Sequence, residues 1–228
     1  DVKNTTTSVS STFKGATKGQ SFGVVVALNK VFGEATAKVR FSLENDQPNL
    51  VSGLGLELEA SNQSAIESTI RLKSLVDDDN FGFSTQSGSK TTVVAAAVAL
   101  NDLRGGALAE LVGGNVEVDS GDIVVSGTNT SLVVATLSAE TMASGVQFGN
   151  ENSSLIVNAL IATNTIRGGA IASVRGGRLT TRSLSGDVSI RTENAATIDS
   201  DLLNTVQDDH LFPVNDSSGI AVSMAFNT

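Results

Sequence analysis

Four apolar runs that each close on an asparagine recur along this chain of 228 residues at nearly constant spacing. The closing residues are Asn29, Asn101, Asn164 and Asn227, which lie 72, 63 and 63 residues apart. After the second of them, apolar residues continue at two-residue intervals, at Ala107, Ala109 and Leu111. Side chains two residues apart share one face of a strand, so the pattern predicts half-buried β-strands. Self-similarity at a fixed period restricts the chain to a repetitive β architecture.

A second phrase with the same alternation begins at Gly121-Asp122 and returns at Gly186-Asp187. In both copies, apolar residues two apart lead to an asparagine, and a further apolar residue follows four positions later. A diverged copy starts near Leu54, where the Gly-Asp pair is lost. The asparagines that mark the three copies are Asn62, Asn129 and Asn194. Because Asp122 and Asp187 hold equivalent positions, we expect structural Asx turns there rather than a reactive site.

The two phrases alternate, so each repeat is expected to hold at least four short strands, with Arg104-Gly105-Gly106 and Arg167-Gly168-Gly169 as linking turns. We predict an all-β fold, a parallel β-solenoid of about three and a half repeats of 63–72 residues. Coils of roughly 20 residues, stacked about 4.8 Å apart, would place about three coils in each repeat. The recurring asparagines would then lie at turns and stack their amides into ladders. The alternative is a row of tandem antiparallel β-sandwich-like modules.

Residues 1–20 differ from the rest, since they are rich in Ser, Thr, Lys and Gly and hold few apolar residues. We expect a polar leader there, or a strand that pairs with something outside the chain. Residues 21–228 are expected to form one repetitive β domain. Its repeats lie at about 21–90, 91–152 and 153–216, with a partial repeat at 217–228.

The composition excludes several classes of function. A formal net charge of −9 argues against a nucleic-acid partner, which requires a clustered basic surface. No apolar run approaches the roughly 18 residues that a membrane-spanning helix needs, so membrane insertion is not expected. The chain has no cysteine, which excludes thiolate catalysis and Cys-ligated metals. It also lacks Trp and Tyr, and a narrow interior of small aliphatic side chains fits that usage better than a deep ligand pocket.

Candidate chemical groups are few. Asp77, Asp78 and Asp79 could hold a weakly bound calcium ion, although a solvated acidic loop is the simpler interpretation. His210 is the single histidine, and no Gly-x-Ser-x-Gly elbow accompanies it. Carbohydrate-cleaving β-helices need paired carboxylates, for which the candidates are Asp119, Asp122, Asp187, Asp199 and Asp201. We expect a protein that is not an enzyme, with no catalytic residue and no cofactor apart from weakly bound calcium.

The Gly-Asp phrases at Gly121 and Gly186 resemble the repeats of large bacterial surface proteins, the filamentous-haemagglutinin-type and giant repetitive adhesins. The resemblance covers about residues 21–206, and a further copy starts at Gly219. It implies a right-handed β-helix that is exported and acts in adhesion or as a rigid stalk at the cell surface. The partners it implies are further repeats or copies of the same protein, with surface glycans as a further partner. Two alternatives stay open: an extracellular filament subunit that assembles through its terminal strands, and a carbohydrate-binding or carbohydrate-cleaving β-helix.

Overall fold

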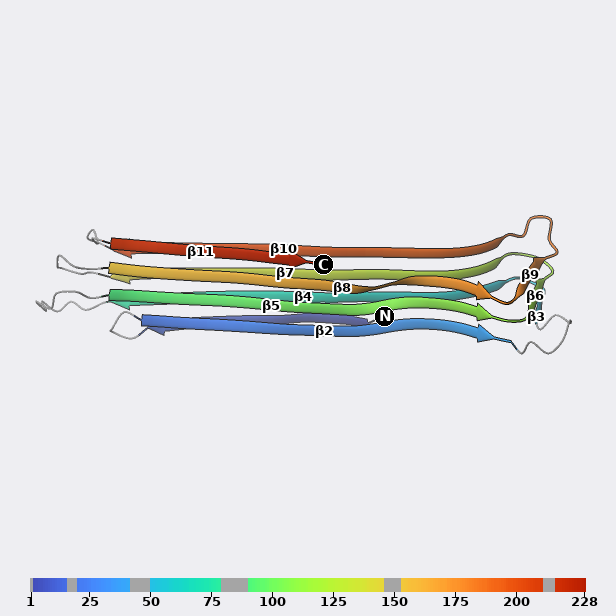
Figure 1. The fold of residues 1–228 in the computed structure, drawn as a ribbon, viewed down its shortest axis with the longest axis horizontal. Coiled ribbons are helices and arrows are strands. Elements are labelled where there is room, and N and C mark those ends of the chain that lie inside the picture. The colour runs from blue at the N-terminus through green and yellow to red at the C-terminus, as the bar shows by residue number, and fades with distance from the viewer. Residues whose placement is uncertain (1, 16–19, 42–49, 79–89, 146–152, 211–215) are drawn as a thin grey trace, which may run out of the picture.

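The computed structural model describes residues 2–15, 20–41, 50–78, 90–145, 153–210 and 216–228, and every regular element in them is a β-strand. The strands form three parallel sheets, which we name A, B and C (Figure 1). Sheet A contains, in spatial order, β1 (Val2–Gly15), β4 (Leu56–Asp78), β7 (Ile123–Gly145) and β10 (Val188–His210). Sheet B contains β11 (Asp216–Asn227), β8 (Ser153–Arg175), β5 (Lys90–Val112) and β2 (Gln20–Arg40). The small sheet C contains β3 (Leu50–Ser52), β6 (Asn115–Val118) and β9 (Arg178–Thr181).

The chain winds through sheets A, B and C in turn, and each circuit adds one strand to each sheet. In sheet A, Leu56 pairs with Ile123, which pairs with Val188, so successive coils are offset by 67 and 65 residues. In sheet B the offsets are 72, 63 and 63 residues. Every strand pair that the structure describes is parallel. The predicted parallel β-solenoid is therefore confirmed, and the antiparallel sandwich alternative is wrong.

One sequence repeat makes one coil, so the predicted division of each repeat into three coils of roughly 20 residues is wrong. The predicted short strands join pairwise into long ones, and β4, β5, β7, β8 and β10 each span 23 residues. The reason lies in the residues expected to break them. The asparagines and both Arg-Gly-Gly segments lie inside strands. The asparagine side chains bond to the neighbouring coil, and the glycines leave room for it.

The corners of the coil lie at other glycines. The chain turns from β5 to β6 at Gly113 and Gly114, whose φ angles are 71° and 77°. Gly121 precedes β7 at the next corner with φ of 87°. Glycine adopts this left-handed backbone without the steric cost that a Cβ atom would add. The Asp187 backbone N–H donates a hydrogen bond to Asp122 Oδ1 at 2.8 Å, so the two Gly-Asp phrases stack at one corner through a bond between coils, which is not the bond of an Asx turn.

Residues 2–15 belong to the solenoid. They form β1, which pairs in parallel with β4 and extends sheet A. The expectation of a polar leader, or of a strand that pairs outside the chain, is therefore wrong for these residues. The segment is polar, but its threonines and valines are β-branched residues that suit a pleated strand.

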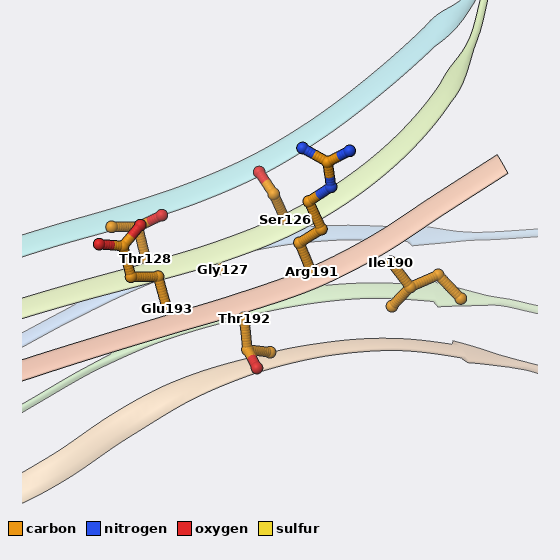
Figure 2. A pocket seen from close by; sticks show the side chains of 7 residues that line it. All are labelled: Ser126, Gly127, Thr128, Ile190, Arg191, Thr192 and Glu193. Carbon is orange, nitrogen blue, oxygen red and sulfur yellow. The ribbon is translucent and has the colours of Figure 1, made fainter. Parts of the chain in front are cut away.

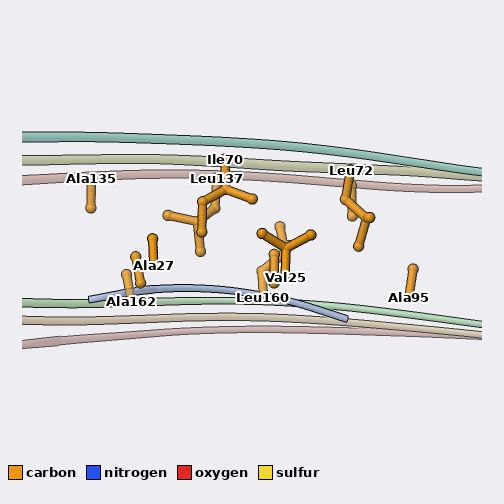
Figure 3. Close-up of a cluster of buried hydrophobic side chains, with 12 residues drawn as sticks. Val25, Ala27, Ile70, Leu72, Ala95, Ala135, Leu137, Leu160 and Ala162 are labelled. Atoms are coloured by element: carbon orange, nitrogen blue, oxygen red, sulfur yellow. The ribbon is translucent and has the colours of Figure 1, made fainter. Parts of the chain in front are cut away.

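Sheets A and B face each other, and their inward side chains form the main core (Figure 3). Ile70 and Leu137 of sheet A pack with Val25 and Leu160 of sheet B. The alanines among them are Ala27, Ala95, Ala97, Ala99, Ala135, Ala139 and Ala162. Small side chains allow two facing sheets to pack without voids, which accounts for a core that uses no Trp or Tyr.

The molecule is a slab rather than a rod. A strand of 23 residues extends for about 75 Å, whereas four stacked strands span only about 15–20 Å. Figure 1 shows this shape, with the strands along the long axis and the coils layered across it. The stacking axis is thus a short direction of this chain.

Candidate functional site

A column of asparagine side chains runs through sheet B along the stacking direction. Asn29 Nδ2 donates to Asn101 Oδ1 at 2.8 Å, and Asn101 Nδ2 donates to Asn164 Oδ1 at 2.7 Å. Asn164 Nδ2 donates both to Asn227 Oδ1 at 3.0 Å and to Ser200 Oγ of the opposite sheet at 2.8 Å. Asn101 is 2% exposed and Asn164 fully buried, so these bonds satisfy polar groups that water does not reach.

Sheet A carries a matching column. Asn62 Nδ2 donates to Asn129 Oδ1, and Asn129 Nδ2 donates to Asn194 Oδ1, both at 2.7 Å. The hydroxyls of Ser64 and Ser131 add bonds of 3.2 Å to the asparagine in their own strand. The predicted amide ladders are therefore confirmed. Their predicted place at turns is wrong, because both columns lie in the middle of long strands and point inward.

Glycine makes room for the sheet A column. Gly33, Gly105 and Gly168 stack in register in sheet B. A Cβ atom on Gly105 would lie 2.9 Å from Asn62 Nδ2 and 3.2 Å from Ser64 Oγ. On Gly168 it would lie only 1.5 Å from the Gly105 carbonyl oxygen. The first glycine of each Arg-Gly-Gly segment thus serves close packing inside a strand and makes no turn.

Charged side chains join the coils on the outer face of sheet B. Glu110 of β5 forms ion pairs with Lys38 of β2 and with Arg175 of β8, the second at 3.5 Å. The hydrogen bond from Lys38 is the main cause that lowers the pKa of Glu110, and the charge of Arg175 acts in the same direction. Three successive coils are tied together through this one carboxylate.

A second charged group lies further along the same face. Arg104 pairs with Asp102 at 2.8 Å, and its hydrogen bond lowers the pKa of Asp102. The Arg104 guanidinium also lies 5.3 Å from the centre of the Phe32 ring in the neighbouring coil, within range of a cation–π contact. Arg104 pairs in register with Arg167, so this row of the sheet is basic.

The carboxylates considered for sugar cleavage lie at the corner before β7 and β10 and on the outer face of β10. Asp122 and Asp187 lie at the stacked corner, while Asp119 faces Arg182 at 3.7 Å. Asp199 and Asp201 are exposed on the outer face of β10. Arg182 also pairs with Glu117, whose hydrogen bond raises the pKa of the arginine. These contacts are those of structural ion pairs.

The three aspartates considered as calcium ligands lie at the end of the described range 50–78 or just beyond it. Asp77 and Asp78 end β4, but their side chains, and Asp79 entirely, lie outside the described residues. Among the residues whose placement is described, no group of three or more His, Cys, Asp or Glu gathers as metal ligands would. Nor does that part of the chain contain a helix long and apolar enough to cross a membrane.

An open groove lies between β7 and β10 near the corner (Figure 2). Its polar lining consists of Ser126 and Thr128 from β7 and of Arg191, Thr192 and Glu193 from β10. Ser126 pairs in register with Arg191, and Thr128 with Glu193. The groove offers a cation, a carboxylate and hydroxyls to a polar ligand.

A large apolar surface, which was not predicted from the sequence, lies on the outside of sheet B. We name the outward side chains of residues 22–28, 94–100, 157–163 and 220–226 the outer apolar face. On β2 its members Phe22, Val24, Val26 and Leu28 are 55–71% exposed. The signal was present, because the continuous apolar runs predict a strand that is buried on both faces. The structure buries only the inward half of the first three runs, and in residues 220–226 both halves are exposed.

No family model matches this chain, and neither a curated protein nor a solved structure matches it. Its function is therefore argued from the stacked coils, the asparagine ladders and the surfaces described above.

Proposed function

We propose that this chain is a structural segment, a stiff β-solenoid that serves as a stalk or scaffold within a large bacterial surface protein. The observation that supports it is the stacking of every coil in register, with an asparagine in the same place in each. The extracellular location and the adhesive role in this proposal rest on the resemblance of the Gly-Asp phrases to the repeats of surface adhesins.

The contacts that support the proposal run from coil to coil along the stacking axis. Backbone hydrogen bonds of parallel sheets run from coil to coil, and the side-chain ladders add bonds along the same axis. In such a quasi-one-dimensional protein the stability is about the sum of each coil and its contacts with its neighbours. Adding coils therefore adds length and stability without requiring new kinds of contact.

The last coil presents a surface on which another coil fits. Val188 and Ile190 of β10 are 45% and 51% exposed, whereas the stacked Ile123 and Val125 of the preceding coil are fully buried. A strand added in the same register would bury the first two as the second two are buried. This supports elongation of the stack at that edge.

Duplicating one coil tests the proposal. Residues 123–187 run from the start of β7 to the corner before β10, so a second copy placed after Asp187 joins Asp187 to Ile123 in the register of the natural corner. We expect the lengthened chain to fold, and its unfolding midpoint in urea to rise, because one more pair of coil interfaces is formed. Circular dichroism would follow the transition.

The control carries an insertion of the same composition in scrambled order, which lengthens the chain without supplying the stacking pattern. An insertion of residues 123–187 that lowers the midpoint as much as the scrambled one would count against a stack built by simple addition of coils.

The filament alternative shares the same supporting observation, since the exposed strand edges at β1 and β2 and at β10 and β11 could meet between copies. End-to-end joining of copies gives a size distribution that grows without limit as the protein concentration rises. Sedimentation velocity at increasing concentration measures it, and a species of fixed, small size at every concentration would end the filament alternative.

A further inference from the structure

The outer apolar face repeats in all four strands of sheet B. The register places Val24 beside Ala96, Ala159 and Val222 in one row across the four strands. Outward residues two positions before or after these form further rows of the same kind. The sixteen outward positions, four on each strand, form four rows. They are Phe22, Val94, Val157 and Ile220; Val24, Ala96, Ala159 and Val222; Val26, Val98, Ile161 and Met224; Leu28, Leu100, Thr163 and Phe226. Thr163 is the single polar member.

Stacking of coils does not require this apolarity. The outer face of β4 in sheet A carries Glu57, Glu59, Glu67, Arg71 and Lys73, and that sheet stacks in the same register. An outward apolar side chain gains nothing from the core behind it. The apolar outer face is therefore best explained by something that covers it, since strands apolar on both sides occur where both sides are buried.

Its size points the same way. Four strands about 4.8 Å apart and four rows about 7 Å apart give an area of about 500 Å². A contiguous apolar patch of this size is comparable to the largest that monomeric proteins expose, and such patches are often functional. Two such faces in contact bury about 1,000 Å² before any polar rim is counted, which meets the lower bound for a specific interface.

We propose that this face pairs two copies of the chain, sheet B against sheet B, about a twofold axis parallel to the stacking direction. Rotation about that axis keeps the stacking directions of the two copies parallel and sets their strands antiparallel. It places the second row of one copy against the third row of the other. Ala96 and Ala159 then face the larger Val98 and Ile161, so small side chains meet large ones across the interface.

Charge supports the same orientation. The outer apolar face is bordered at one end by Lys30, Asp102, Arg104 and Arg167, which together carry net positive charge, and at the other by a row that contains Gln20 and Leu155. The twofold axis brings each basic border to the uncharged border of the partner, which avoids like-charge contacts. This pairing is lateral, so it goes beyond the proposed elongation of the stack.

The test uses the full chain with Val98→Lys and Ile161→Glu together. These positions are direct neighbours in the register, so opposite charges keep the two coils compatible while both charges would be desolvated in the interface. Sedimentation equilibrium over 1–200 µM protein is expected to show a dimer for the unchanged chain. We expect the double variant to dissociate at least about 100-fold more readily.

The matched control is Val134→Lys on the outer face of sheet A, where Asp199 is the register neighbour. It should dimerise as the unchanged chain does. Thermal unfolding followed by circular dichroism checks that both variants are folded. A monomeric unchanged chain at 200 µM, or a double variant that dimerises as tightly as the control, would overturn the proposal. Species larger than a dimer that persist in the double variant would report end-to-end stacking. The experiment therefore distinguishes lateral pairing from elongation of the stack.

The absence of cysteine provides a second measurement. A mixture of Ala96→Cys and Val98→Cys chains should form a disulfide-linked dimer under mild oxidation, because the proposed axis places these two rows opposite each other. Either variant alone should crosslink more slowly. Equal crosslinking in the mixture and in the two separate samples would rule out this axis.

Discussion

A buried amide shared between coils does two things at the residue scale. It satisfies its own donor and acceptor, and it favours one alignment of the neighbouring strands. Asn129 shows both, because it accepts from Asn62 and donates to Asn194 and Ser131 while only 1% exposed. A shift of one residue would turn it outward and bury an unmatched neighbour in its place.

Replacing Asn129 by alanine should therefore be costly. The Asn62 amide would lose its acceptor in a site that water does not reach, and we expect the free energy of unfolding to fall by about 1–3 kcal/mol. Urea unfolding followed by circular dichroism measures the change. The control is Thr130→Ala, since Thr130 is exposed on the outer face, and it should change the free energy by less than about 0.5 kcal/mol. Equal losses in the two variants would argue against the ladder as a source of stability.

The ladders also show how far residue-level prediction reaches. Recurrence at 63 residues was enough to predict that Asn101 stacks on Asn164. It was not enough to place them in a strand, because asparagine is common at turns and the sequence does not show that a column of partners is available.

At the scale of the strand, the inward glycines of sheet B allow neighbouring coils to lie close together. Gly168→Ala should be destabilising by about 1–3 kcal/mol, because its Cβ atom would lie 1.5 Å from a backbone oxygen of the neighbouring coil. Thermal unfolding would show the loss as a lowered midpoint.

The adjacent Gly169 is the matched control. No atom lies within 4 Å of the Cβ atom that an alanine would add there, so Gly169→Ala should be neutral or slightly stabilising. If both substitutions lowered the midpoint alike, loss of strand flexibility rather than the close approach would be the cause.

The strand boundaries were the least predictable feature of the elements. Two-residue alternation continues on both sides of each asparagine, and that alternation correctly indicates β-structure. Glycine next to arginine suggested a turn, but whether a glycine turns the chain or admits a neighbour depends on what packs against it. Gly113 and Gly105 lie only eight residues apart in β5 and its following corner, and they serve these two different purposes.

At the scale of the whole molecule, ion pairs that span several coils link stability to pH. The pKa of Glu110 is lowered in the folded chain below its usual 4.5, so its pairs with Lys38 and Arg175 stabilise the fold above pH 4.5. That stabilisation is lost as the pH falls through the lowered pKa, because the folded state must then take up a proton.

Glu110→Gln should consequently lower the thermal midpoint at about pH 7, and the difference from the unchanged chain should shrink as the pH drops below 4.5. Glu67→Gln, on the exposed outer face of β4, removes one negative charge elsewhere and controls for the change in net charge. A midpoint difference for Glu110→Gln that stays constant down to the acid range would show that the pairs do not depend on its ionisation.

The stacked architecture could be predicted from the repeats, whereas the length of each coil and the number of coils could not. The period of 63 residues predicts stacked units, but one long coil and three short ones share the same period. The outer apolar face was equally hidden, because the apolar runs do not reveal which side of a strand the chain itself covers. Both quantities depend on how the strands pair, and pairing is a property of the folded molecule.

The side-chain dipoles of the two asparagine columns are aligned along the stacking axis. In both columns every amide donates from the earlier coil to the later one, so their dipoles add along the stack instead of cancelling. Hydrogen bonds in such a chain polarise and strengthen one another. Each column begins, toward β1 and β2, with an asparagine that donates into the stack, and ends, toward β10 and β11, with one that accepts from it. A joint between copies that continued these columns would have to be head-to-tail, so we expect the proposed elongation to have a fixed polarity.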